Sequence, residues 1–571
     1  MENKTLRQEY LSKFFAGNRL AYSVMLLSAI LFGALNLAVA WLMQQLVDNV
    51  SEVQGALPLR VLALLTAGII LLILPFKALN YFSEPRFMKK AMTQFKRFAF
   101  EKLVQKSIAS FQNEATGVYL SAFSNDLTTI ETNYLEKQYI LIFNTVWACG
   151  AIVLMLAYSP VLAVVAVCLC AMPLFVSSFT GKHMEKAQKV TSERNAEFVS
   201  SLKDILSGFS VIKSFRAESS ATDLLKQSSA AVESARCRKR KLTVILSAIG
   251  GIAGISAQLG TFLVGAMLAQ QGFGITPGIL FVFMDLTGAV IVSVREMPEL
   301  LANRRAALSL VDKMAASLEA NVRDEGMDIP NHLENGISIR SLRFGYEPGN
   351  EILHDINIDF EAGKSYAIVG NSGSGKSTLL NLLMASCHDY DGTICFDNAE
   401  LRNISSKSLY ELVSMIEQNV FVFDASVRDN ITMFRDFPAA DVDRAVTLSG
   451  LSKLIEQSGT DYLCGENGRG LSGGEKQRIS IARGLLQNSS VLLADEVTAA
   501  LDAQTAYQVT GDILKLDGIT RIVVTHALVE SLLKQYDGII VLKDGYIVEK
   551  GTFENLMEQK GYFYALYTVA Q

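Results

Sequence analysis

The chain has 571 residues, of which 50% are hydrophobic and 19% are charged, and its net charge is -5. This length suggests about two to four domains, and the apolar half argues against a wholly water-soluble protein. The mild net charge gives no indication of nucleic-acid binding, and no nucleic-acid partner is expected. The seven cysteines are scattered without C-x-x-C spacing, so unpaired thiols are expected.

Six apolar stretches in the first half are long enough to cross ~30 Å of hydrocarbon as helices of about 20 residues. The third and fourth meet at Tyr158, Ser159 and Pro160, which predicts a tight hairpin. No cleavable signal sequence is evident, so the first stretch is expected to direct membrane insertion. The spans are expected near residues 20–46, 58–82, 139–159, 160–180, 242–270 and 275–298.

The distribution of Lys and Arg predicts the orientation. The long connections, residues 83–138 and 181–241, carry many basic residues, whereas the short turns carry almost none. By the positive-inside rule, the long connections and both termini are therefore expected on the cytoplasmic side of the membrane. The protein is expected to be a multi-pass protein of the cell membrane, which in a bacterium is the cytoplasmic membrane. The connections also have helical patterns, so the spanning helices are expected to extend beyond the bilayer.

Polar residues are few inside the spans. A carboxylate such as Asp285 is costly in lipid and should face a protein interior or a cavity that holds water. Two interpretations stay open: a contact to substrate or proton, or a structural bond such as an ion pair with Lys77. The candidate residues of a substrate cavity are Asn36, Gln258 and Asp285.

A phosphate-binding loop follows an apolar strand-like segment at residues 365–369. It fits the pattern G-x-x-x-x-G-K-[ST], in which backbone N–H groups surround the phosphates, the Lys reaches the β and γ oxygens, and the hydroxyl holds Mg²⁺. By itself this pattern predicts binding of a nucleoside triphosphate. The expected nucleotide-binding residues are Gly370, Asn371, Ser372, Gly373, Ser374, Gly375, Lys376, Ser377 and Thr378.

A second motif narrows the class of protein. About a hundred residues after the phosphate-binding loop, the chain reads Leu471, Ser472, Gly473, Gly474, Glu475, which resembles the signature sequence of the ATP-binding-cassette (ABC) family. The resemblance covers essentially the whole chain, with specific motifs in the second half and a matching pattern in the first. It implies a half-size exporter-fold transporter with fused membrane and nucleotide-binding domains, and ATP as the nucleotide.

The expected fold is an α-helical six-span membrane domain followed by a soluble α/β P-loop ATPase domain of ABC type. The composition changes near residues 320–335. The expected domains are therefore 1–320 for the membrane part, 321–334 for a linker and 335–571 for the nucleotide-binding part. Residues 116–126 and 206–218 are similar to the family's two coupling helices.

Hydrolysis needs a metal ion, a positioned water and compensation of charge on the γ-phosphate. Residues 491–494 and 522–524 are predicted to be buried parallel strands. Asp495 and Glu496 follow the first of these, resembling a Walker B element. Asp495 is expected to hold Mg²⁺ with Ser377, and Glu496 to accept a proton from the attacking water or to orient it.

The resemblance implies further roles, residue by residue. Tyr346 matches the aromatic residue that stacks on adenine, and Gln418 the glutamine that touches the metal and moves with the membrane domain. Glu466 matches an acidic residue that contacts coupling helices. Asp502, after Ala500 and Leu501, matches the segment that crosses to the partner subunit. His526 matches the switch histidine that hydrogen-bonds the γ-phosphate.

In this family the signature motif serves the nucleotide of a second chain, and the resemblance implies the same role here. Ser472 and Gly474 stand at the start of a helix, and a helix N-terminus favours a γ-phosphate. One chain with six spans and one ATPase domain is therefore expected to dimerise and to close two composite sites. The partner is a second copy of the chain or a homologous half-transporter, and the sequence leaves both open.

The expected function is ATP-driven transport by alternating access, with export of a hydrophobic or amphipathic drug, lipid or peptide. Two alternatives stay open. Some transporters with this fold import metal-siderophores, and a non-transporting ATP-dependent membrane regulator would carry the same motifs. The sequence does not name the substrate.

Overall fold

The computed structural model describes residues 2–112, 114, 116–319, 326–347, 349–387, 389–498 and 501–570, without the side chains of 2–4, 172–183, 185 and 570. Ala500 and residues 321–325 of the expected linker lie outside these ranges. Internal contacts divide the chain into two compact units. The membrane unit comprises Met1–Leu103 and Gly117–Glu319, and the ATPase unit comprises Val104–Thr116 and Ala320–Gln571.

The described part of the membrane unit is helical throughout, with short turns between the helices. Two π-helical turns, η1 and η2, continue from α5 through α6 into α7. The elements are α1 (Glu2–Phe15), α2 (Arg19–Val50), α3 (Leu59–Val104), α5 (Thr116–Ser121), η1 (Ala122–Asp126), α6 (Leu127–Ile130), η2 (Glu131–Leu135), α7 (Lys137–Tyr158), α8 (Pro160–Cys170), α9 (Met172–Ser207), α10 (Phe209–Ser214), α11 (Glu218–Gln270) and α12 (Pro277–Glu319).

Within the described residues, five stretches of helix are long and apolar enough to span a membrane: α2, α3, the continuous segment Thr116–Tyr158, α11 and α12. The expectation that helices extend beyond the spans is confirmed, since α11 alone has 53 residues. At ~1.5 Å per residue it measures about 80 Å, more than twice the hydrocarbon thickness.

The fourth expected span, 160–180, is divided between two helices in the structure: α8 ends at Cys170, and α9 begins at Met172 after Ala171. Pro173 explains the restart: proline has no N–H and fits the first turn of a helix but not its interior. The predicted hairpin is confirmed, with Ser159 between α7 and α8 accepting a hydrogen bond from the Leu162 N–H.

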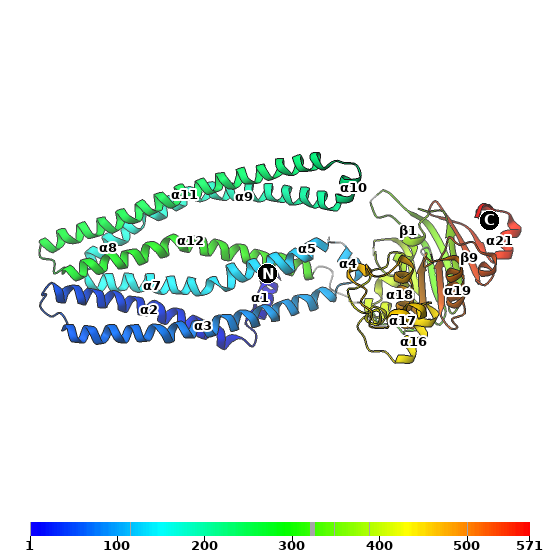
Figure 1. The fold of residues 1–571 in the computed structure, drawn as a ribbon, viewed down its shortest axis with the longest axis horizontal. Coiled ribbons are helices and arrows are strands. Elements are labelled where there is room, and N and C mark those ends of the chain that lie inside the picture. Colours follow the sequence, from blue (N-terminus) through cyan, green and yellow to red (C-terminus); the bar gives the residue numbers. More distant parts are fainter. Residues whose placement is uncertain are drawn as a thin grey trace. The chain divides into compact units, whose positions relative to one another are not determined.

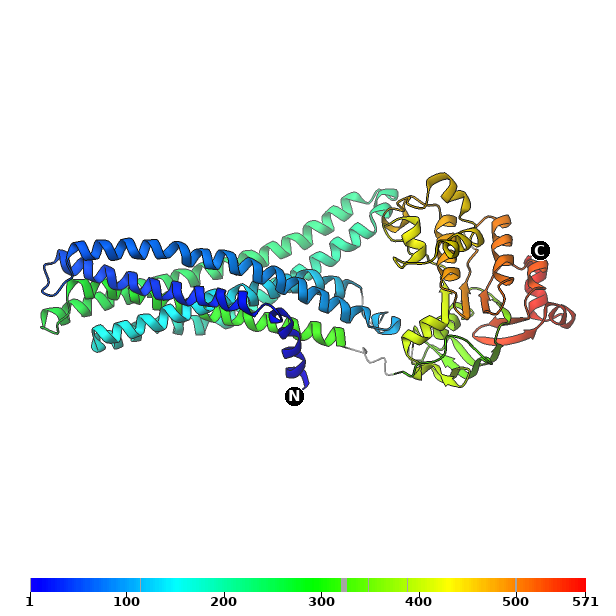
Figure 2. The same ribbon diagram turned by 90° about the horizontal axis from the view of Figure 1, so that it is seen from below.

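The helices α2, α7 and α12 pack together, and α11 contacts α8, α9 and α12. The pair α9 and α11 runs side by side and diverges from the other helices toward α10, which joins them (Figures 1 and 2). We call this pair with α10 the α9–α11 arm. Around α10 the arm exposes large apolar side chains, from Leu206, Phe209, Val211 and Phe215.

The ATPase unit contains two sheets. A four-stranded antiparallel sheet has the order β2-β1-β4-β5, and a six-stranded sheet has the order β10-β9-β3-β8-β7-β6, in which only β10 runs antiparallel to its neighbour. The strands are β1 (Gly336–Phe344), β2 (Leu353–Glu361), β3 (Ser365–Gly370), β4 (Asp391–Phe396), β5 (Ala399–Glu400), β6 (Val413–Ile416), β7 (Val491–Asp495), β8 (Thr520–Val524), β9 (Gly538–Lys543) and β10 (Tyr546–Gly551).

The predicted buried strands are confirmed. Every residue of β3, β7 and β8 is buried, as expected for central strands covered on both faces. Helices α16, α17 and α18 gather beside one part of the sheet (Figure 1). The helical elements are α4 (Ile108–Gln112), α13 (Lys376–Leu383), η3 (Leu401–Asn403), α14 (Ser406–Leu412), α15 (Val427–Thr432), α16 (Ala439–Leu448), α17 (Ser452–Ser458), η4 (Glu466–Gly468), α18 (Gly473–Leu486), α19 (Ala503–Leu514), α20 (Glu530–Leu533), α21 (Phe553–Gln559) and α22 (Tyr562–Ala570).

Two segments outside the expected nucleotide-binding domain belong to the ATPase unit. Part of the expected linker is packed against it, since Met327 bridges to Ile404 and Asp328 accepts hydrogen bonds from Ser405 and Ser408. The second segment is α4, where the Ile108 N–H donates to the Tyr410 hydroxyl at 3.3 Å. The contact with Tyr410 thus lies just before the stretch 116–126, whose coupling role stays a prediction.

Candidate ATP-hydrolysis site

The expected nucleotide-site residues gather at one edge of the six-stranded sheet. The neighbouring parallel strands β3, β8, β7 and β6 all end there. Residues 370–378 follow β3, Gln418 comes soon after β6, Asp495 ends β7, and His526 follows β8. The carboxyl edge of a parallel sheet is where ligands bind in α/β proteins. The sheet order therefore brings together residues that are more than a hundred positions apart.

The phosphate-binding loop leads directly into α13. Gly375 precedes this helix with φ = 97°, and a Cβ there would lie 2.6 Å from Leu353, so only glycine fits. The Lys376 ammonium donates to the carbonyl oxygens of Gly370 and Asn371, both at 3.0 Å. Burial lowers the pKa of Lys376, and the nearby carboxylates Glu496 and Asp495 oppose that shift.

Two buried oxygens in this loop region have no hydrogen-bond partner in the described part of the chain: Ser374 Oγ and Asp495 Oδ1. Burial raises the pKa of Asp495, while a hydrogen bond from Ser377 acts against this. A carboxylate oxygen without a partner next to a hydroxyl is a donor set that suits a hard cation such as Mg²⁺. The residues present therefore fit the expected metal.

Glu496 is held from two sides. Gln418 Nε2 donates to Glu496 Oε2 at 2.7 Å, and His526 Nε2 lies 2.7 Å from Glu496 Oε1. The backbone of Glu496 is also fixed, because its carbonyl accepts from Gln477 Nε2 at 3.1 Å and its φ is 49°. A glutamate in this sparsely populated conformation costs about 1 kcal/mol or more and persists only where its surroundings impose it. The three expected catalytic residues thus meet in one cluster.

The signature motif forms the N-terminus of α18. Ser472 and Glu475 form a capping box: Ser472 Oγ accepts from the Glu475 N–H at 3.3 Å, and a Glu475 carboxylate oxygen accepts from the Ser472 N–H at 2.7 Å. Leu471 is buried and anchors the motif, whereas Ser472 and Gly473 are exposed. The exposed helix end leaves its first amides available to an anion.

The other expected residues of the ATPase unit lie at its surface. Tyr346 is 57% exposed, with Phe344 edge-on to its ring at 4.9 Å, so one face can meet a planar base. Asp502 caps α19 by accepting from the Thr505 N–H at 3.0 Å. Glu466 is exposed and lies 3.7 Å from Arg469. The coupling and interface roles of Glu466 and Asp502 remain predictions.

The three candidate substrate residues lie on three helices of the membrane unit. Asn36 donates to the Phe32 carbonyl of its own helix at 2.7 Å, and Gln258 donates from α11 to the Met284 carbonyl of α12 at 3.4 Å. Asp285 is exposed on α12. Lys77 lies over the Phe32 ring at 4.1 Å, and no ion pair with Asp285 is found among the described side chains.

Some residues that support the site were missed in the sequence. Gln477, in the first turns of α18, ties the signature helix to the backbone of Glu496. Arg483, farther along α18, donates to the carbonyl of Phe421 and to both the carbonyl and the side chain of Asn430. Motif patterns do not reveal such partners, because the backbone carbonyls that Gln477 and Arg483 hold are 19 to 62 positions away in the sequence.

The fold and the site define an ATPase whose catalytic domain is fused to a set of long apolar helices. The model for the ABC transporter family matches residues 353–499, and the model for the ABC transporter transmembrane region matches residues 22–294. Together they cover most of the chain, and the chain belongs to the ABC transporter family. It is an ATP-driven membrane transporter that binds ATP and hydrolyses it.

Similar curated proteins match nearly full length. The chain is 27% identical over 563 residues to an ATP-dependent lipid A-core flippase of Desulfotalea psychrophila, covering 96% of each chain. It is 27% identical over 489 residues to the flippase of the same name in Salmonella typhimurium, covering 84% of this chain and 83% of that one. It is 28% identical over 496 residues to the ABC transporter ATP-binding protein YwjA of Bacillus subtilis, covering 83% of each.

A solved structure supports the fold. A bacterial Atm1-family ABC exporter with ATP bound superposes with a TM-score of 0.84 at 24% sequence identity, covering 96% of this chain and 99% of that chain. The predicted fold class, helical membrane domain followed by an ABC-type ATPase domain, is therefore confirmed.

Proposed function

We propose that this chain is a half-transporter that exports an amphipathic compound, with a lipid as the leading substrate class. The observation that carries the proposal is the match over almost the whole chain to a lipid A-core flippase. The sparse charge of the membrane helices agrees with a substrate that carries a large apolar part. A drug or an apolar peptide has the same chemistry and belongs to the same proposal.

At the nucleotide site, Lys376 and the amides of residues 373–378 hold the phosphates, and Tyr346 stacks on the adenine. Mg²⁺ would be held by Ser377, Asp495 and Gln418, and would offset charge on the phosphates. Glu496 accepts the proton of the attacking water or orients it, and the 2.7 Å contacts with Gln418 and His526 keep its carboxylate in place. His526 then reaches the γ-phosphate.

The proposed transporter is a dimer with two composite sites. The signature motif Leu471 to Glu475 leaves its helix end exposed, ready for ATP held by another chain. The apolar tip of the α9–α11 arm supports the same assembly. Phe215 is 81% exposed and Leu206 is 63% exposed, which is costly in water and calls for a protein partner. Residues 206–218 therefore fit a coupling contact with the second chain, and 116–126 and Glu466 complete the coupling set.

The proposed location is the cytoplasmic membrane of a bacterium, with both termini and the ATPase domain in the cytoplasm. The basic long connections support this orientation. Binding of ATP would draw two ATPase domains together, and hydrolysis would reset them, which opens the membrane domains to alternate sides in turn.

The transport proposal is tested in proteoliposomes that contain the purified full-length chain and fluorescent lipid analogues. ATP should move a labelled lipid from the leaflet on the ATPase side to the opposite leaflet, as read by dithionite quenching. Movement in the reverse direction, or ATP hydrolysis with no movement of lipid, drug or peptide, would contradict the export proposal.

The composite sites are tested by mixing two inactive variants, Lys376→Ala and Ser472→Ala, at equal amounts. In a mixed dimer with shared sites, one site carries both substitutions and the other carries neither. Half of the dimers are mixed, so about a quarter of wild-type ATPase activity should return. Sites confined to single chains would give no recovery.

A further inference from the structure

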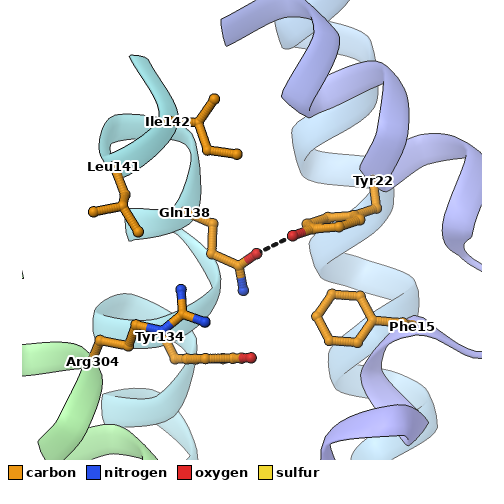
Figure 3. Close-up of a pocket in the computed structure, with 7 residues that line it drawn as sticks. All are labelled: Phe15, Tyr22, Tyr134, Gln138, Leu141, Ile142 and Arg304. Carbon is orange, nitrogen blue, oxygen red and sulfur yellow. Dashed lines mark hydrogen bonds between the residues drawn. The ribbon is translucent and has the colours of Figure 1, made fainter. Parts of the chain in front are cut away.

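A cavity of about 330 Å³ lies at one end of the membrane unit. Its lining residues lie between positions 15 and 304, before the nucleotide-site residues in the sequence. Helices α1, α2, α7 and α12 and the π-helical turn η2 contribute to it. Its lining combines aromatic, aliphatic and polar side chains with one cation (Figure 3). The lining residues are Phe15, Tyr22, Tyr134, Gln138, Leu141, Ile142 and Arg304.

Arg304, the cation among the described lining residues, is held against an aromatic ring. The Arg304 guanidinium lies over the Tyr134 ring at 5.0 Å from its centroid. Among the described side chains, the structure records no ion pair for Arg304. A positive charge that faces a cavity without a carboxylate partner makes the cavity attractive to an anion. Arg305, the next residue, is exposed and does not line the cavity.

Two further side chains are positioned beside this cation. Gln138 is only 5% exposed, and the Tyr22 hydroxyl donates to its Oε1, so its amide nitrogen is turned the other way. Figure 3 shows this nitrogen, the Tyr134 hydroxyl and the Arg304 guanidinium directed into the same space. All three are hydrogen-bond donors, and a planar guanidinium matches the oxygens of a phosphate group in a bidentate manner.

The cavity lies where the apolar spans end. Tyr22 is near the start of α2, Gln138 is the second residue of α7, and Arg304 lies beyond the apolar part of α12. This end of α12 continues along the chain toward the ATPase unit. Aromatic side chains with an arginine at the end of a span are typical of the level of lipid headgroups. Asn36 is 14 residues from Tyr22, roughly 20 Å along the helix axis, so the candidate substrate residues are at a different depth.

We propose that this cavity binds the phosphate group of an anionic lipid headgroup, with Arg304, Tyr134 and Gln138 as donors and Phe15, Leu141 and Ile142 against the apolar part of the lipid. The site is separate from the nucleotide site and holds lipid from the leaflet on the ATPase side. It does not depend on the direction of transport or on the transported compound.

The test counts bound lipid by native mass spectrometry of the full-length protein titrated with phosphatidylglycerol. Arg304→Gln should weaken the tightest binding step about tenfold, because a hydrogen-bonded contact to a charged group is lost. Arg305→Gln, which removes the neighbouring charge outside the cavity, should leave that step unchanged. Equal binding by these two variants would overturn the proposal.

Two further arms identify the source of the phosphate and protect against a folding defect. Phosphatidylcholine, which has no net charge, should bind at least several times more weakly than phosphatidylglycerol. Inorganic phosphate at 10 mM should not displace phosphatidylglycerol, and displacement would overturn the assignment of the site to a lipid. Tyr22→Phe removes only the hydroxyl that orients Gln138, and should weaken binding about two- to threefold with an unchanged melting temperature. If Tyr22→Phe and Arg304→Lys, each made as a single variant, both bind phosphatidylglycerol as the wild type does, the proposal is also overturned.

Discussion

The two units of this transporter hold their candidate functional residues in different ways. In the ATPase unit, Glu496 has a partner on each carboxylate oxygen and a third partner on its backbone carbonyl. In the membrane unit, the hydrogen bond of the Asn36 side chain found in the described part of the chain goes to a carbonyl of its own helix, and Asp285 is exposed. Phosphate chemistry needs atoms fixed to fractions of an ångström, whereas binding of an apolar substrate depends on shape and area. This difference in requirement explains why the sequence of the ATPase unit contains specific motifs, whereas the sequence of the membrane unit shows a pattern of apolar stretches.

The largest effect should come from Glu496, whose carboxylate both Gln418 and His526 contact. Glu496→Gln keeps the shape and the contact from Gln418 but removes the charge that accepts a proton. Steady-state ATPase activity should fall at least about 100-fold, the size of a lost general base, and closed dimers should accumulate. Phosphate release and size-exclusion chromatography with ATP measure the two effects.

Glu554→Gln, an exposed glutamate of α21, is the control for this experiment and should hydrolyse ATP normally. Normal turnover by Glu496→Gln would refute the role of Glu496 as base and would remove the contrast between the two units.

A smaller effect is expected at Asp285. Asp285→Asn removes a charge from an exposed position of α12, and a lost contact of about 1 kcal/mol would raise the substrate concentration for half-maximal ATPase stimulation about fivefold. The measurement is a titration of the stimulating compound in reconstituted lipid. Glu299→Gln, exposed farther along the same helix, is the matched control. The same half-maximal concentration in wild type and Asp285→Asn would remove Asp285 from the substrate site.

The contact of α4 offers a third, smaller test. Tyr410→Phe removes the hydroxyl that accepts from the Ile108 N–H, a bond worth about 1 kcal/mol. If this contact transmits motion, the number of substrate molecules moved per ATP should fall about two- to threefold while hydrolysis continues. Tyr507→Phe, at an exposed position of α19, serves as the control. An unchanged transport-to-hydrolysis ratio would show that the contact between α4 and Tyr410 does not couple ATP hydrolysis to transport.

The smallest effect concerns stability of the ATPase unit. Asp397 accepts from the N–H groups of Glu334, Asn335 and Gly336 at 2.7–3.0 Å. Burial raises the pKa of Asp397, but these donors outweigh it and the pKa is lowered overall. Asp397→Asn should therefore destabilise the unit by about 1 kcal/mol at neutral pH, a value kept small by solvent screening.

The pH dependence of this effect follows from the sign of the shift. A lowered pKa means that the stabilisation is complete above the ordinary carboxyl value near 4 and is lost as the pH falls through the lower folded-state value. Thermal melting of the wild type and Asp397→Asn should differ at pH 7 and converge below about pH 4. A difference that grows on acidification would contradict this account.

The predictions from sequence were most complete for motifs in which the chemistry allows few residue types at each position. Motifs predicted the phosphate-binding loop, the Walker B pair, Gln418 and His526, and the structure brings Gln418, Glu496 and His526 together. The buried strands β3, β7 and β8 were also predicted, because continuous apolar runs are characteristic of central parallel strands. In the fourth expected span, hydropathy registers the apolar length of 160–180 and not the position where the helix is interrupted, at Ala171 beside Pro173.

The sequence alone determined the class of this protein and predicted its nucleotide-site residues, because phosphate binding constrains residue type at fixed spacing and membrane burial requires long apolar stretches. Only the tertiary structure decided which distant residues meet. Gln477 donates to the backbone carbonyl of Glu496, the Tyr410 hydroxyl accepts from the first residue of α4, and the Arg304 guanidinium lies over the Tyr134 ring. These contacts join segments whose spacing along the chain is set by packing, and packing follows from the shapes of many side chains at once.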